Sequence, residues 1–175
     1  KSNEKKQKSS TSKLSNKRML KEIKKMQSAK TRELGISAIP REDNLMIWDA
    51  YMHQDGFDPD DTLTKDLNAK KIDSVHLEVH IPHRYPFEPP FIMVISPKFK
   101  CQTGHITMNG AICHEILAPK KWLPTYSIES LLIDIRSNIL QGGAELDPHN
   151  WKGQYSFSGA KSDYERVMRA HGWLN

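Results

Sequence analysis

The chain has 175 residues, of which 37% are hydrophobic, and a formal net charge of +5. This length is enough for one domain with a core of its own. The longest purely apolar run, Phe91 to Ile95, is far too short to span a membrane. Two cysteines, Cys101 and Cys113, cannot make a disulfide framework, which favours a reducing compartment such as the cytoplasm or the nucleus.

The charge is unevenly distributed along the chain. Residues 1–30 hold eleven Lys or Arg and two Glu, whereas residues 31–175 hold fifteen basic and nineteen acidic residues. A basic stretch can contact nucleic acid, but no aromatic residue before Trp48 offers a base a stacking surface. We therefore predict a disordered basic tail over residues 1–11 and a folded domain over residues 12–175. Neither nucleic acid nor a membrane is expected as a partner.

The first predicted elements are a helix and four strands. Apolar residues recur at helical spacing after Ser12 and predict an amphipathic helix that ends at Gly35; these residues are Met19, Leu20, Ile23 and Met26. Strands are predicted over residues 35–39, 45–52, 75–81 and 91–95, with a polar loop over residues 55–73. Residues 75–82 alternate between apolar and polar, which is typical of a sheet with one buried face.

The second half is predicted to be irregular from Pro97 to Ser127 and helical after it. Ser127 is the expected N-cap of an amphipathic helix that Gly142 and Gly143 end. A capping-box pattern over residues 162–165 predicts a final helix over residues 164–171. The fold class is therefore α+β, with an N-terminal helix, a four-stranded antiparallel meander, an irregular active-site segment and C-terminal helices. Because the chain begins at Lys1 without a signal-peptide pattern, we expect it to be a segment of a longer protein.

Cys113 is the candidate nucleophile. Residues 109–117 read NGAICHEIL, so this thiol comes just after an Asn-Gly turn within an otherwise apolar run. A thiol with an ordinary pKa of about 8.5 is only a few per cent thiolate at pH 7, yet it is a capable nucleophile. Such a thiol can accept an acyl group as a thioester and pass it on without a strong base. The alternative is a core cysteine, since free Cys is among the most buried residue types.

Three motifs in order resemble the ubiquitin-conjugating enzyme (UBC) family over roughly residues 12–175. They are KRMLKEI at residues 17–23, YPFEPP at residues 85–90, and NGAICHEIL followed by Trp122 and by YSI at residues 126–128. The ending HGW at residues 171–173 looks most like the Q-type subfamily. The resemblance implies the UBC fold. It also implies that Cys113 accepts ubiquitin as a thioester from the activating enzyme and transfers it to Lys, and in the Q type also to Ser or Thr hydroxyls, of a protein substrate.

The same resemblance implies partners but no cofactor, because the activating enzyme consumes the ATP. It implies that Lys17, Arg18 and Lys21 dock the activating enzyme, although a solvated helix face is the alternative for such residues. It implies that Phe87 and Pro124 contact ubiquitin ligases of the RING or HECT type, while Trp122 is expected to pack beneath their loops.

One position departs from the family pattern. The family has a His-Pro-Asn tripeptide whose Asn, eight residues before the cysteine, supports the oxyanion formed during transfer. Residues 103–105 here read TGH, which puts His105 at the Asn position. His105 is a candidate N–H donor or a weak general base for a hydroxyl, and the alternative is that it only packs against the active segment. Asp147, with Glu145 nearby, is a candidate for activating the acceptor.

Other interpretations stay open. His114 is expected to be structural, and a zinc site built from Cys101, His105, Cys113 and His114 matches no usual ligand spacing, so no metal is expected. A catalytically silent UBC-fold module that binds ubiquitin or a ligase is one alternative function; the family's inactive variants lack the cysteine. Conjugation of another ubiquitin-like modifier is the second.

Overall fold

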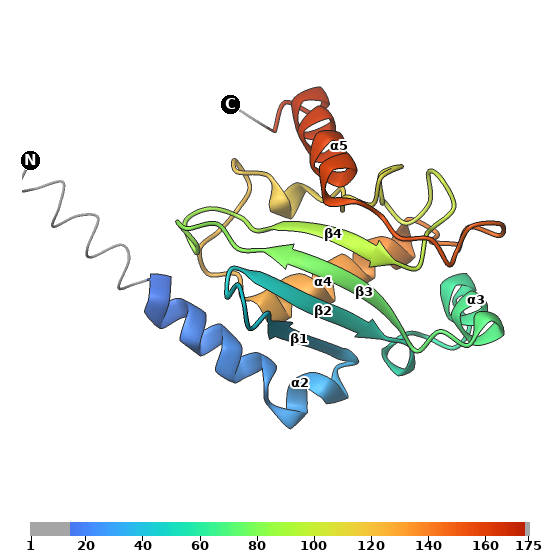
Figure 1. Cartoon of the computed structure of the whole chain (residues 1–175), viewed down its shortest axis with the longest axis horizontal. Coiled ribbons are helices and arrows are strands. Elements are labelled where there is room, and N and C mark those ends of the chain that lie inside the picture. Colours follow the sequence, from blue (N-terminus) through green and yellow to red (C-terminus); the bar gives the residue numbers. More distant parts are fainter. Residues whose placement is uncertain (1–14, 174–175) are drawn as a thin grey trace, which may run out of the picture.

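A computed structural model describes residues 15–173, and Figure 1 shows a four-stranded sheet with helices around it. The tail predicted over residues 1–11 lies outside the described residues. Residues 15–26 form the described part of the first helix. The remaining elements follow in this order: α2 (Ala29–Glu33), β1 (Ile36–Pro40), β2 (Ile47–His53), η1 (Gln54–Gly56), α3 (Thr62–Lys70), β3 (Ser74–His80), β4 (Phe91–Ser96), η2 (Glu115–Leu117), α4 (Ile128–Gln141) and α5 (Phe157–Ala170).

The predicted antiparallel meander is confirmed. The strands lie in the order β1-β2-β3-β4, and each pairs antiparallel with the next. Their bounds differ from the predicted ones by one or two residues. The alternation in β3 has its expected cause, because Val75, Leu77 and Val79 are fully buried on one face.

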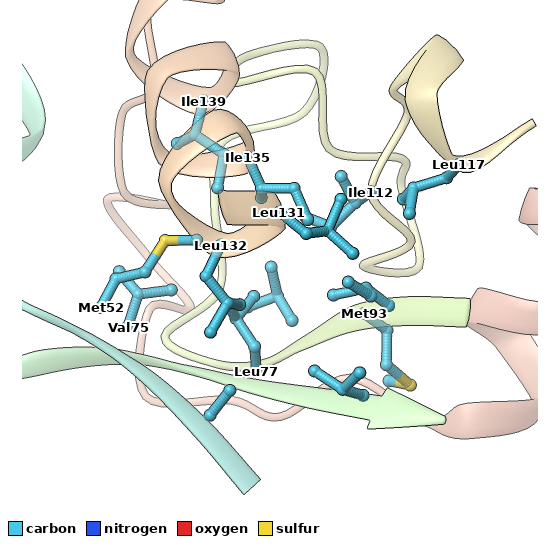
Figure 2. Close-up of a cluster of buried hydrophobic side chains, with 14 of the residues drawn as sticks. Met52, Val75, Leu77, Met93, Ile112, Leu117, Leu131, Leu132, Ile135 and Ile139 are labelled. Carbon is cyan, nitrogen blue, oxygen red and sulfur yellow. The ribbon is translucent and has the colours of Figure 1, made fainter. Parts of the chain in front are cut away.

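Helix α4 covers that buried face (Figure 1). Figure 2 shows its apolar side chains, among them Leu132 and Ile135, packed toward Leu77 and Met52 of the sheet. Ile112, next to Cys113, belongs to the same cluster. The segment that carries the candidate nucleophile is therefore anchored in the main hydrophobic core.

The ends of α4 agree with the prediction. The Ser127 hydroxyl accepts from the N–H of Ser130 (3.1 Å), and the Ser130 hydroxyl accepts from the N–H of Ser127 (3.0 Å). This reciprocal capping box satisfies two N–H groups that a helix start leaves without intrahelical partners. Gly142 is the C-cap.

Three predicted boundaries are wrong. The span 55–73 is not a loop, because it contains η1 and α3, and α3 buries Leu63 and Leu67 on one side. The last helix begins at Phe157 instead of residue 164, since Ser156 caps it by accepting from the N–H of Gly159 (3.3 Å). The single N-terminal helix is in fact two helices, and Leu20 points away from the core with 69% of its surface exposed. Within residues 15–173, no helix is long and apolar enough to cross a membrane.

Candidate active site

Cys113 lies at the open end of a tight hairpin over residues 105–113. Ile106 and Ile112 pair across the hairpin in an antiparallel bridge, and both are buried. Next to them, the N–H of Cys113 donates to the carbonyl oxygen of His105 (2.9 Å). Because burial of the two isoleucines holds the hairpin against the core, Cys113 has a fixed place beside the sheet.

The turn of this hairpin needs glycine at position 110. The N–H of Gly110 donates to the carbonyl of Thr107 (2.9 Å), which closes the turn that the Asn-Gly pair predicts. Gly110 has a φ of +92°, and a Cβ there would lie 2.5 Å from the ring of Tyr155. Both the backbone angle and the close ring exclude any side chain at this position.

The Cys113 thiol is free and half-buried, so it is not sealed in the interior. Burial raises its pKa above the ordinary value for a thiol. Cys113 is therefore mostly a thiol at neutral pH, and its reactivity depends on accessibility and geometry more than on a strongly lowered pKa.

A residue that sequence reasoning missed contacts the Cys113 backbone. The side-chain amide of Asn138, on α4, donates through Nδ2 to the carbonyl oxygen of Cys113 at 3.3 Å. Asn138 lies on the half-buried side of a helix whose apolar spacing drew attention to other positions. It brings an N–H donor next to the candidate nucleophile.

His105 sits opposite Cys113 in the hairpin, as its spacing of eight residues suggested. Its φ is +52°, and its ring packs on Gly142 at the end of α4 so closely that a Cβ on Gly142 would lie 2.7 Å from His105 Cδ2. The His105 side chain is exposed. This position fits both the donor and the packing interpretation.

His114 has a structural contact. Its Nδ1 accepts from the N–H of Ile116 (3.3 Å) and caps η2, which leaves the proton on Nε2 in the neutral ring. Burial lowers the pKa of His114, although the charges of Asp134 and Glu115 oppose this. The ring is therefore neutral at physiological pH.

A cleft of about 470 Å³ lies between η2 and α4. His114, Asp134 and Asn138 are among its lining residues. Since Asn138 also contacts the Cys113 carbonyl, the cleft begins beside the candidate nucleophile and is wide enough to take an extended peptide segment.

Asp147 lies in a different cleft, of about 140 Å³, together with Cys101 and Tyr155. Its Oδ1 accepts from the N–H groups of His149 and Asn150, both at 2.9 Å, and these bonds lower its pKa. The two clefts share no lining residue. The contacts of Asp147 thus explain a turn cap, and its predicted role in activating the acceptor stays a prediction.

The candidate zinc ligands do not form a cluster. Across residues 15–173, no group of three or more His, Cys, Asp or Glu side chains is arranged to hold a metal ion.

The residues predicted to dock the activating enzyme differ in their surroundings. Lys17 and Lys21 are exposed on the helix over residues 15–26. Arg18 is instead held in place: its Nε donates to Glu22 (2.5 Å), and its Nη1 donates to the carbonyl oxygen of Pro124 (3.0 Å). The two lysines are available to a partner, whereas much of Arg18 joins this helix to the Pro124 loop.

Glu22 is a second residue that sequence reasoning missed. It is only 2% exposed, and its carboxylate accepts from the Tyr85 hydroxyl (3.2 Å) and from the N–H of Ile128 (2.9 Å) as well as from Arg18. This one carboxylate therefore connects the first helix to the YPFEPP turn and to the start of α4.

The residues predicted to contact a ligase are exposed. Phe87 has 49% of its surface exposed, and Pro124 is exposed on the neighbouring loop. Trp122 lies beneath them, 6% exposed, with its Nε1 donating to the carbonyl oxygen of Pro86 at 2.7 Å. The expected packing of Trp122 is confirmed.

Comparison with known proteins decides the family. The family model described as "Ubiquitin-conjugating enzyme" matches residues 18–171. The chain belongs to the ubiquitin-conjugating enzyme family. This match includes the hairpin, Cys113, the cleft and all three motifs, and it confirms the resemblance predicted from the sequence.

Related family members carry the Q designation. The chain is 28% identical over 137 residues to a ubiquitin-conjugating enzyme of Mus musculus named as Q-like protein 1, covering 75% of this chain and 83% of that protein. It is 30% identical over 161 residues to "Ubiquitin-conjugating enzyme E2 Q1" of Homo sapiens, covering 88% of this chain but only 37% of that protein.

Solved structures confirm the UBC fold. A ubiquitin-conjugating enzyme of Plasmodium falciparum superposes with a TM-score of 0.56 at 21% identity, covering 71% of this chain and 83% of that one. The E2 domain of a Toxoplasma gondii ubiquitin-conjugating enzyme gives a TM-score of 0.54 at 21% identity, covering 91% of this chain and 95% of that one.

Proposed function

We propose that this chain is an active ubiquitin-conjugating enzyme, and that Cys113 carries ubiquitin as a thioester. The observation that carries the proposal is a free, half-buried thiol, fixed by a hairpin beside a cleft with an amide donor. A silent binding module has no need of a reachable thiol in this place. The chemistry requires a reduced cysteine, so the proposal includes a reducing compartment such as the cytoplasm or the nucleus.

Charging is a thiol exchange. The Cys113 sulfur gives up its proton and attacks the carbonyl carbon of the thioester on the activating enzyme. A new C–S bond forms, the old one breaks, and the departing cysteine of the activating enzyme takes up a proton. No electron is gained or lost overall. The activating enzyme has already consumed ATP, so this chain uses no cofactor.

Transfer breaks the Cys113 thioester in turn. A substrate amine or hydroxyl attacks the carbonyl carbon, loses a proton, and Cys113 leaves as a thiol. Negative charge develops on the carbonyl oxygen, and one well-placed donor for such an oxygen is worth about 2.7–4 kcal/mol. The donors near Cys113 are the Asn138 amide and the His105 ring, because the Cys113 N–H is already donated to the His105 carbonyl.

His105 also bears on which acceptor is used. An amine needs little help from a base once it is neutral, whereas a hydroxyl gains from a base near pKa 6.5. The proposal therefore includes Lys acceptors and, through His105, Ser or Thr acceptors. Discharge of the charged protein to free lysine and to free serine or threonine tests this role. If His105→Ala leaves both rates unchanged, His105 only packs against Gly142.

The partners in this proposal use the exposed residues. Lys17 and Lys21 offer positive charge to the activating enzyme, with Arg18 adding part of its guanidinium. Phe87 and Pro124 offer a rigid apolar contact to a ligase of the RING or HECT type, since an exposed aromatic ring beside prolines loses little entropy on binding.

The deciding experiment mixes the chain with activating enzyme, ATP and ubiquitin and compares gels with and without reductant. A ubiquitin adduct that reductant removes is expected, and Cys113→Ser should convert it to an adduct that resists reductant. Cys101→Ser is the matched control, because Cys101 is the other free cysteine and lies in the other cleft. No adduct with ubiquitin, but one with another ubiquitin-like modifier, would change the modifier; no adduct with any would leave a binding module.

A further inference from the structure

We infer that Asp163 of α5 is a positioning residue that holds Cys113 in place through the tip of the hairpin. The inference rests on the proposed function only where transfer is measured, because the state of the uncharged thiol can be measured by itself. Asp163 touches no reacting atom, and 54 positions of sequence separate it from Asn109 at the tip.

The contact is direct and directional. One carboxylate oxygen of Asp163, Oδ2, accepts from the backbone N–H of Asn109 (3.0 Å) and from its side-chain Nδ2 (3.1 Å). The other oxygen, Oδ1, accepts from Arg166 (3.1 Å). Asn109 lies in the turn of the hairpin, four residues before Cys113.

The burial of Asp163 indicates that these bonds matter. Asp163 is 7% exposed, and a buried carboxylate is costly unless it is hydrogen-bonded. Burial opposes its ionisation, but the bonds from Asn109, Arg166 and Thr107 outweigh this and lower its pKa below the usual value. The carboxylate is therefore charged at neutral pH, and charged acceptors make stronger hydrogen bonds than neutral ones.

The hairpin can carry this constraint from its tip to the thiol. Next to Asn109, the carbonyl of Gly110 accepts from the N–H of Val94 in β4 (2.8 Å), and the Tyr155 ring closes the space above Gly110. The paired residues that follow lead to Cys113, whose carbonyl Asn138 holds from α4. Helices α5 and α4 thus fix the two ends of the hairpin.

The same helix also contacts the chain beyond Cys113. The Tyr164 hydroxyl donates to the carbonyl of Leu117 (3.1 Å), four residues after Cys113. Asp163 and Tyr164 are consecutive residues of α5, which lies beside β4 (Figure 1). One turn of this helix therefore holds the chain on both sides of the thiol.

A positioning role predicts a specific pattern of rates. Misplacement of a reacting group by about 1 Å can slow a reaction about a hundredfold. Asp163→Ala should slow discharge of the Cys113 thioester to saturating free lysine about tenfold or more, with the half-saturating lysine concentration unchanged. Asp163→Asn keeps an acceptor oxygen for Asn109 and should restore most of the rate.

The experiment uses the full chain with Cys101→Ser as background, so that iodoacetamide reports on Cys113 alone. The variants are Asp163→Ala, Asp163→Asn, Asn109→Ala, and Asp163→Ala with Asn109→Ala. Glu165→Ala is the matched control, since it removes a carboxylate from α5 that pairs with Arg169 instead of the hairpin. Thermal unfolding, the alkylation rate of uncharged Cys113, and the discharge rate are measured for each.

Three outcomes support or overturn the inference. Changed alkylation and slower discharge in Asp163→Ala, with no further change when Asn109→Ala is added, support it. An Asp163→Ala variant that behaves like Glu165→Ala in both reactions, or slowing that simply multiplies in the double variant, overturns it. Should Asp163→Ala not fold, Asn109→Ala removes part of the same contact from an exposed residue. If the parent chain takes no ubiquitin, the proposed function fails, and alkylation alone decides on Asp163.

Discussion

Arg18 is expected to stabilise the domain as well as meet a partner, and Arg18→Ala tests this. Its guanidinium donates to Glu22, to the Pro124 carbonyl and to the Tyr126 carbonyl, and it lies 5.7 Å from the centre of the Tyr85 ring. Truncation removes all of these contacts at once. The main loss is at Glu22, which is left as a buried carboxylate without its cation.

The size of the effect follows from burial. Removal of one partner from a buried ion pair costs about 3–5 kcal/mol. The Arg18 side chain is 22% exposed, and Glu22 keeps its bonds from Tyr85 and Ile128, so the lower end, about 3 kcal/mol, applies. With a urea m-value of about 2 kcal/mol/M, the midpoint should fall by about 1.5 M.

The assay is urea unfolding followed by circular dichroism, with Lys17→Ala and Lys21→Ala as controls. Both lysines are exposed on the same helix, so their unfolding free energies should change by less than about 0.5 kcal/mol. Charging by the activating enzyme, measured where all variants are folded, should be slower for all three.

An Arg18→Ala midpoint equal to that of the two lysine variants would refute this reasoning. It would mean that Glu22 finds other donors, and that the bonds from Arg18 to the Pro124 loop contribute little to stability. Arg18 would then be an ordinary docking residue.

Three further predictions concern the hairpin and its supports. Gly142→Ala should cost about 1–3 kcal/mol by overpacking and slow thioester discharge, because its Cβ would lie 2.7–2.8 Å from His105 and Gly104, whereas Gly143→Ala, at φ +62° with open space, should cost about 1 kcal/mol and leave discharge unchanged; equal discharge rates would contradict this. Alkylation of Cys113 in the Cys101→Ser background should rise with pH to a midpoint above the ordinary thiol value of about 8.5, since burial raises its pKa; a midpoint below that value would show a missed activating group. Because the pKa of Asp163 is lowered in the folded state, its stabilisation is complete above the unfolded value of about 3.9 and is lost as pH falls through the folded pKa; the difference in unfolding free energy between the parent and Asp163→Asn should therefore be constant from about pH 5 to 8 and shrink below pH 4, and a difference that grows in acid would contradict it.

The parts of the fold that sequence predicted well are those with a long, regular pattern. Helix α4 repeats its apolar residues over four turns and has a clear cap, and β3 alternates over its whole length. Helix α3 was missed because only Leu63 and Leu67 mark its buried side within an Asp-rich stretch. A stripe of one helical turn is too short to distinguish a helix from a polar loop.

The start of α5 shows a different cause of error. Residues 162–165 look like a capping box, but Asp163 is in mid-helix, and its carboxylate bonds to Asn109 instead of to its own helix start. The true cap, Ser156, precedes a weak helix-forming run that contains Gly159. Local competition between two capping patterns was decided by a distant contact.

The candidate site divides in the same way. Cys113, Trp122 and the Asn-Gly turn belong to one local motif, so their relative placement could be predicted from the sequence. Asn138 and Asp163 reach the hairpin only through the tertiary fold, from positions 25 and 54 residues away. Glu22 was missed because, four residues after Arg18, it looks like half of an ordinary surface ion pair.

The grip of α5 on both flanks of the thiol separates two units that are easily equated. A shortened protein ending after α4 would still contain every stretch by which the family is assigned, yet it would lose Asp163 and Tyr164 together. The portion that identifies the protein is thus smaller than the portion that holds its thiol still. Any neighbouring domain or binding protein that shifts this last helix would adjust the thiol from outside, without ever entering the cleft.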